Sequence, residues 1–88
     1  MNFRVSVAHE AEKILDRLDR PTEQRVRARF VQIALDPFDS RLSAPLADKP
    51  GIRKSRVGGW RILFTADREA KVIYILTVDT RGQVYKHS

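Results

Sequence analysis

Hydrophobic residues follow a period of two at the start of the chain and a helical period after it. In residues 2–7, Phe3, Val5 and Val7 share one face, which predicts a half-buried strand. Two segments with helical spacing follow, and Pro21 suits the first turn of the second. Their apolar positions are Ala11, Ile14, Leu15 and Leu18, then Val26, Phe30, Ile33 and Ala34. Because few residues separate the segments, they predict an antiparallel helical hairpin.

The second half of the chain carries strand patterns instead. We predict strands over residues 52–57, 60–66 and 72–78, with a further short strand near 83–86. Gly58-Gly59 is typical of a two-residue hairpin turn. Residues 38–50 show no sustained periodicity and are expected to form a loop. The order β-α-α-β-β-β, with a small last strand, predicts one α+β domain over residues 1–88. It has an antiparallel sheet and an N-terminal helical hairpin packed on one face.

Composition narrows the class of protein. With 88 residues the chain has room for one modest core. It has no cysteine, which fits a reducing, cytoplasmic setting and leaves no thiolate metal site. No apolar run approaches the roughly 20 residues that cross a bilayer, and the first residues lack a secretory signal pattern. We therefore expect a soluble cytoplasmic protein without a membrane partner.

The net charge of +6 lies in the second half of the chain. Residues 1–48 hold eight Lys/Arg and eight Asp/Glu, whereas residues 49–88 hold nine Lys/Arg and three Asp/Glu. Such an excess is typical of a surface that contacts a polyanion. The alternative is a basic surface that is simply solvated.

The hairpin register gathers three of these cations. If Gly58-Gly59 forms the turn, Val57 lies opposite Trp60 and Arg56 lies opposite Arg61. Lys54 then shares their face, because side chains alternate along a strand. We call Lys54, Arg56 and Arg61 the cation cluster. Cations side by side repel one another, so a bound anion would explain them; the alternative is that they extend into water.

The end of the chain adds further candidates. Tyr85 can stack on a base or take part in proton transfer, and His87 titrates near neutral pH. A histidine so near the end of the sequence can equally be a frayed, solvated side chain. The second half offers neither a carboxylate pair for Mg²⁺ nor a Cys/His cluster for zinc, so we expect no metal or cofactor. RNA permits cleavage without metal because its own 2′-OH can attack the phosphate.

Two stretches resemble the RelE/ParE superfamily of bacterial type II toxin–antitoxin systems, and its RelE-like branch in particular. Residues 54–64 are similar to that family's basic β-hairpin, and residues 81–86 to its C-terminal Arg-x-x-Val-Tyr-basic stretch. The resemblance implies the RelE-like microbial RNase fold. It also implies an mRNA interferase that cuts mRNA in the ribosomal A site by 2′-OH attack and so inhibits translation. Its partners would be the ribosome, mRNA and a RelB-like antitoxin with an acidic segment.

The resemblance assigns roles by position. The expected catalytic residues are Lys54, Arg61, Arg81, Tyr85 and His87, and the expected RNA contacts are Arg56, Lys49, Arg53 and Lys86. Which of Lys54, Tyr85 or His87 transfers protons is left open. The alternative function is that of a ParE-like inhibitor of DNA gyrase, which acts by binding and has no nuclease activity.

Overall fold

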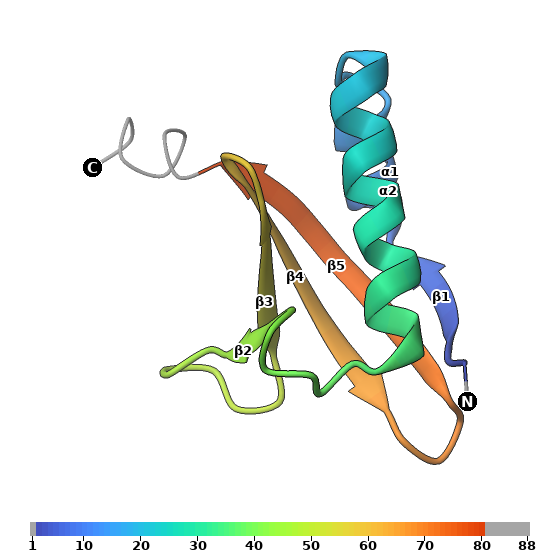
Figure 1. Ribbon diagram of the computed structural model, residues 1–88, viewed down its shortest axis with the longest axis vertical. Helices are drawn as coiled ribbons and strands as arrows, with labels where there is room; N and C mark the ends of the chain where they lie inside the picture. Colours follow the sequence, from blue (N-terminus) through green and yellow to red (C-terminus); the bar gives the residue numbers. More distant parts are fainter. Residues whose placement is uncertain (1, 81–88) are drawn as a thin grey trace.

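A computed structural model describes residues 2–80 and contains two helices and a five-stranded sheet (Figure 1). The elements are β1 (Arg4–Val7), α1 (His9–Leu15), α2 (Arg20–Leu35), β2 (Ala44–Pro45), β3 (Arg53–Val57), β4 (Trp60–Asp67) and β5 (Val72–Thr80). Across the sheet the strand order is β1-β5-β4-β3-β2. The predicted α+β class and the predicted order of helices and strands are confirmed.

The sheet is mixed rather than purely antiparallel. Strands β3, β4 and β5 pair antiparallel as predicted, and the additional strand β2 pairs antiparallel with β3. Strand β1 instead pairs in parallel with β5, with Arg4 opposite Val72 and Val7 opposite Ile75. A parallel pair needs a long crossover between its strands, and both helices and the other three strands supply it here. Strand β5 is rich in apolar residues, as suits an interior strand, and it has a neighbour on each side.

Strand β2 lies within the stretch that was expected to be a loop. Its two residues pair with β3, with Ala44 opposite Lys54 and Pro45 opposite Arg53. Pro45 is tolerated because β2 is an edge strand, where one side of the backbone needs no ladder hydrogen bond. Two residues are too few to show a period of two, so the sequence pattern could not reveal this strand. The short strand predicted near residues 83–86 lies outside the described residues.

Helix α2 begins and ends where local chemistry dictates. Its N-cap is Asp19, whose Oδ2 accepts a hydrogen bond from the backbone N–H of Thr22 at 3.2 Å. Hydrogen bonds from the side chain and backbone of Thr22 lower the pKa of Asp19. Pro21 occupies the first turn as predicted. The helix stops before Asp36-Pro37, because a residue that precedes proline avoids helical geometry.

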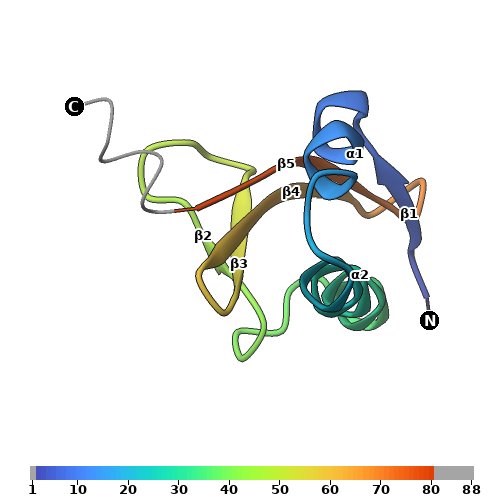
Figure 2. The same ribbon diagram turned by 90° about the horizontal axis from the view of Figure 1, so that it is seen from above.

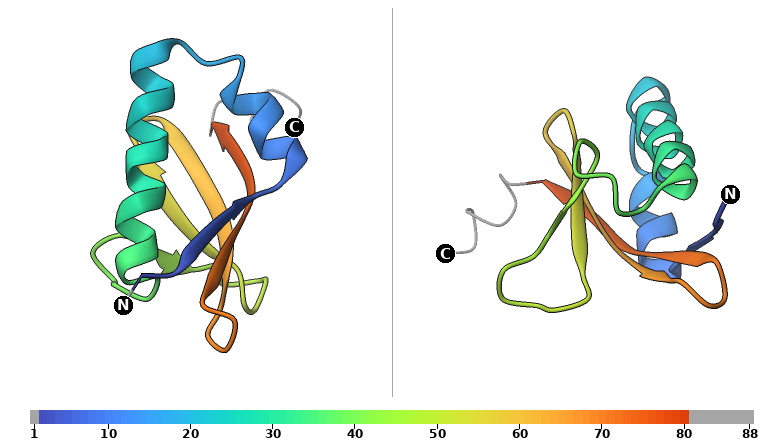
Figure 3. Two further views of the ribbon diagram at one scale, coloured as in Figure 1. Left: turned by 90° about the vertical axis from the view of Figure 1, so that its right-hand side faces the viewer. Right: turned by 60° about the horizontal axis from the view of Figure 1, so that its bottom comes forward.

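The two helices run in opposite senses and are joined by an ion pair. Figure 3 shows α1 leading away from β1 and α2 running back along the sheet. Arg27 of α2 reaches Glu12 of α1 at 2.9 Å and Glu23 of its own helix at 2.9 Å. These hydrogen bonds, that from Glu12 first, raise the pKa of Arg27. Within residues 2–80, neither helix is long and apolar enough to cross a membrane.

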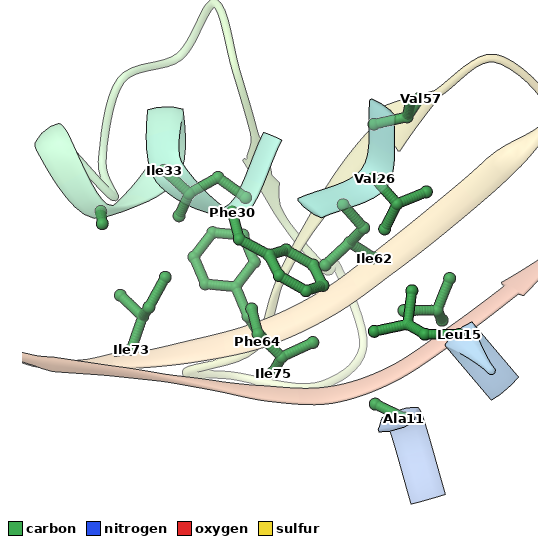
Figure 4. Close-up of a cluster of buried hydrophobic side chains, with 12 residues drawn as sticks. Ala11, Leu15, Val26, Phe30, Ile33, Val57, Ile62, Phe64, Ile73 and Ile75 are labelled. Carbon is green, nitrogen blue, oxygen red and sulfur yellow. The ribbon is translucent and has the colours of Figure 1, made fainter. Parts of the chain in front are cut away.

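One hydrophobic core joins both helices to one face of the sheet (Figure 4). Its buried members are Ala11, Leu15, Val26, Phe30, Ile33, Ala34, Val57, Ile62, Phe64, Ile73, Ile75 and Val78. Each helical residue in this set was predicted from the apolar spacing. Figure 2 shows α1, α2 and β1 gathered at one side of the molecule, with β2 and β3 at the other. The candidate site therefore lies on the part of the sheet that is farthest from α1.

Candidate nucleic-acid interface

The β3–β4 hairpin has the predicted register and brings the cation cluster together. Val57 pairs with Trp60, Arg56 with Arg61 and Lys54 with Leu63. Gly58 has a φ of +59°, the left-handed value that a tight hairpin turn needs and that glycine adopts without strain. All three cations thus lie on the outer face of the sheet, opposite the core.

Position along the hairpin separates buried from accessible side chains. Ile62 and Phe64 are completely buried on the inner face, and Ser55 beside them is 1% exposed. On the outer face Lys54 and Arg61 are half-buried and Arg56 is exposed. The alternation predicted from the sequence therefore gives this hairpin one packed face and one open, cationic face.

A β-bulge in β5 brings an acidic residue to the cation cluster. Strand β5 carries one extra residue between its pairs with Phe64 and Leu63. Alternation counted from Ile75 would turn Asp79 toward the core. The extra residue instead places Val78 in the core, where it is fully buried, and turns Asp79 to the outer face.

Asp79 holds Arg61 through two hydrogen bonds. The two residues are directly opposite across β4 and β5, and Nε and Nη2 of Arg61 each donate to one carboxylate oxygen of Asp79 at 3.1 Å. The side chains are 27% and 24% exposed. A bidentate pair fixes the orientation of the guanidinium as well as compensating its charge. The cluster therefore has a structural anchor at Arg61, which was not predicted because the hairpin register was considered without β5.

Lys54 and Arg56 differ from Arg61 in this respect. Within residues 2–80, neither side chain makes an ion pair or a side-chain hydrogen bond. Their charges are therefore uncompensated on the outer face. Long cationic side chains of this kind are suited to a phosphate, which offers several oxygen acceptors.

Arg53 lies on the opposite face from the cluster. Its Nε donates to Ser43 Oγ at 2.9 Å and its Nη2 to the Ser43 carbonyl oxygen at 3.1 Å, and its guanidinium lies 5.5 Å from the ring centre of Phe38. These contacts tie the loop before β2 to β3. Lys49, the other predicted contact of this region, is exposed in the loop that precedes β3.

A shallow basic depression of about 320 Å³ lies along the edge of β3. It is lined by Arg29, Ser40, Arg41, Leu42, Ser43, Ala44, Lys54 and Arg56. We call it the edge depression. Arg29 was not singled out from the sequence, since it reads as one of several charged residues on the polar side of α2. Its role depends on a contact with β3 that no local pattern indicates.

The remaining predicted site residues are Arg81, Tyr85, Lys86 and His87, and they lie outside the described residues. Their positions relative to the cation cluster stay predictions. Among residues 2–80, no three His, Cys, Asp or Glu side chains are grouped so that they could hold a metal ion.

A sequence model of one protein family matches almost the whole chain. The family is described as the ParE toxin of the type II toxin–antitoxin system, parDE, and the match covers residues 5–85. A sequence search of curated proteins finds no match.

Solved structures with a similar fold include the following chains of toxin–antitoxin complexes. The RelBE2 complex of Mycobacterium tuberculosis contains a chain 25% identical to this one, with a TM-score of 0.78 and coverage of 92% of this chain and 100% of that one. The RelE–RelB complex of Pyrococcus horikoshii gives 21% identity, a TM-score of 0.77 and coverage of 94% and 99%. The intact RelBE complex of E. coli gives 16% identity, a TM-score of 0.78 and coverage of 89% and 95%.

Proposed function

The chain belongs to the ParE toxin family of type II toxin–antitoxin systems, within the RelE/ParE superfamily, and from this premise we propose that it is an endoribonuclease. Its proposed substrate is mRNA on the ribosome, in the cytoplasm, and its effect is to stop translation. One observation carries the proposal: the cation cluster lies on a single open face, with the charges of Lys54 and Arg56 uncompensated. A polyanion is the ligand that such a face favours.

The chemistry follows from the groups that the face offers. The 2′-OH of the nucleotide attacks the adjacent phosphorus and loses its proton, while the 5′-oxygen leaves and takes up a proton. The products are a 2′,3′-cyclic phosphate and a 5′-hydroxyl end. Arg61, whose orientation Asp79 fixes, stabilises the charge that develops on the phosphate oxygens. Lys54 acts at the same phosphate as an electrostatic partner, and one of Lys54, Tyr85 or His87 transfers the protons.

Asp79 already accepts hydrogen bonds from the Arg61 guanidinium that a phosphate would use. In the structure the carboxylate occupies two of the guanidinium's three nitrogens, so a phosphate competes with Asp79 for Arg61 or shares it. Arg56 lies directly opposite Arg61 and serves as an RNA contact in this proposal.

The test is primer extension on mRNA from translating ribosomes. We expect cuts at fixed positions within codons for the wild-type chain, and their loss in Arg61→Ala. Arg17→Ala is the matched control, because Arg17 is exposed in the turn after α1 and its substitution removes the same charge. Cutting that persists in Arg61→Ala at the wild-type rate would exclude the assigned role of the cluster.

The second candidate function is inhibition of DNA gyrase by binding. The family description favours it, and so does the Arg61–Asp79 pair, since a compensated arginine is suited to a protein interface as well as to catalysis. Cells in which expression of the chain is induced distinguish the two functions. If their mRNA stays intact and gyrase–DNA cleavage complexes accumulate, the chain is a gyrase inhibitor and not a nuclease.

A cognate antitoxin is expected under both functions. The three solved relatives described above are each complexes of a toxin with its antitoxin. We expect a small acidic protein encoded beside this gene to co-purify with the chain. Substitution of its acidic residues by amides is expected to weaken the complex more at low salt than at high salt, because salt already screens the attraction.

A further inference from the structure

The edge depression exists because β3 extends beyond its neighbour β2. Strand β2 pairs only with Lys54 and Arg53, so the rest of β3 has no strand beside it at that edge. Arg29 of α2 takes this place: its Nη1 donates to Ser55 Oγ at 2.9 Å and to the backbone oxygen of Arg56 at 2.9 Å. A side chain thus satisfies a strand edge that would otherwise be unpaired.

This arrangement leaves hydrogen-bond donors around the depression. Nε of Arg29 donates to Gln32 and Nη1 to β3, whereas Nη2 makes none of the side-chain bonds observed within residues 2–80. The side chains of Lys54 and Arg56 also make no ion pair or hydrogen bond within the described residues. No aspartate or glutamate is among the described residues that line the depression. The wall is therefore rich in donors and carries excess positive charge.

Arg41 contributes a fourth cation whose charge is masked. Its Nε and Nη2 bind the carboxylate of Asp39 at 3.1 and 2.9 Å, although the Arg41 side chain is 88% exposed. The hydrogen bond from this side chain lowers the pKa of Asp39, so the carboxylate stays ionised at neutral pH. Asp39 thus weakens one wall of the depression.

We infer that the edge depression is a second phosphate subsite, which binds the backbone of single-stranded RNA beside the phosphate held by Lys54 and Arg61. This inference rests on the proposed nuclease function and extends it to Arg29, Ser40 and Arg41. The depression and the cation cluster share Lys54 and Arg56, so a continuous chain of phosphates can pass from one to the other. Protein interfaces are anchored by buried aromatic and arginine side chains, and no aromatic residue is among the described residues that line the depression, so its open, cationic wall favours a phosphate.

The subsite is tested by the salt dependence of binding to single-stranded oligouridylate, measured by fluorescence anisotropy. Each phosphate contact on a single strand contributes about 0.7 to the slope of log K against log salt concentration. We expect Arg29→Gln to make the slope shallower by about one such contact, and Arg17→Gln to leave it unchanged. An unchanged slope in a folded Arg29→Gln variant would overturn the subsite.

A second variant, for which tighter RNA binding is expected, distinguishes loss of the subsite from misfolding. Arg29 also holds β3, so Arg29→Gln can lose affinity through structure alone. Asp39→Asn keeps an oxygen for the backbone N–H of Arg41 but removes the charge that masks its guanidinium. We expect tighter binding and a steeper slope, and loss of this gain in Asp39→Asn/Arg41→Gln. Equal or weaker binding by Asp39→Asn contradicts the subsite.

The outcomes separate the subsite from the function on which it rests. If the wild-type chain does not bind oligouridylate, the subsite fails, whereas the nuclease proposal is decided by primer extension on translating ribosomes. If it binds but the Arg29 and Asp39 variants match the wild type, only the subsite fails. If the variants change affinity for a polyglutamate peptide and not for oligouridylate, the depression binds an acidic protein and the inference is wrong.

Discussion

The two faces of the β3–β4 hairpin arise from one alternating sequence, but hydrophobic packing fixes the inner face and not the outer one. The inner face places Ile62 and Phe64 in the core, where packing against α2 fixes each side chain. The outer face holds Lys54 and Arg56, which contribute nothing to that packing and make no ion pair within residues 2–80. Folding thus determines the inner face closely and leaves the outer face available for binding and chemistry.

Truncation of one residue on each face should give the largest difference in the free energy of unfolding. Phe64→Ala removes a fully buried ring, and we expect a loss of about 3–5 kcal/mol in the free energy of unfolding. Lys54→Ala should change that free energy by no more than about 0.5 kcal/mol. Urea denaturation measures both. Equal losses would show that the outer face is structural after all.

Loss of the polar link between α2 and β3 should have the next largest effect on the free energy of unfolding. Ser55 is buried, and its Oγ donates to the Leu42 carbonyl oxygen at 2.6 Å while it accepts from Arg29 at 2.9 Å. Ser55→Ala leaves both partners without this hydrogen bond, at a cost of about 1–3 kcal/mol. Thermal unfolding is the readout. A neutral substitution would mean that water replaces the hydroxyl, so that the inner face tolerates the loss.

Asp79→Asn tests whether the outer face has one structural contact or none. The pair is partly buried and bidentate, so we expect a loss of about 1–2 kcal/mol in the free energy of unfolding. RNA affinity should rise at the same time, because Arg61 loses its competing carboxylate. A double-mutant cycle with Arg61→Ala isolates the coupling between the two side chains. A coupling of zero would contradict the assigned anchor.

The smallest effect is expected far from both faces, at the N-cap of α2. Asp19→Ala removes the acceptor for the Thr22 N–H and should lower Tm slightly. The folded-state pKa of Asp19 is lowered, so its contribution is fully present above the ordinary pKa of aspartate and is lost as pH falls through the folded value. The Tm difference between wild type and Asp19→Ala should therefore shrink in acid. A difference that grows in acid would contradict the cap.

The sequence predicted those parts of the fold that follow from local periodicity. Pro21 and the spacing of Val26 and Phe30 predicted α2, and Gly58-Gly59 fixed the register that aligns Arg56 with Arg61. Those features depend on neighbours in sequence or on one tight turn.

The features that were missed depend on contacts between distant segments. The bulge that turns Asp79 outward depends on how β5 fits β4, and alternation within β5 alone gives the wrong face. The parallel pairing of β1 and the reach of Arg29 to Ser55 are likewise tertiary contacts. Roles assigned to Arg81, Tyr85 and His87 stay predictions, since these residues lie outside the described part of the chain.

Whether the open face of the hairpin cleaves RNA is decided by the chemistry of the new RNA ends. Ribosome-bound mRNA from induced cells is labelled at 5′-hydroxyl ends, with the wild-type chain and with Lys54→Ala/Arg56→Ala. We expect abundant 5′-hydroxyl ends with the wild type and their absence with the double variant, whose Tm stays near the wild-type value. Intact mRNA with the wild type, or equal cleavage by the double variant, would contradict it.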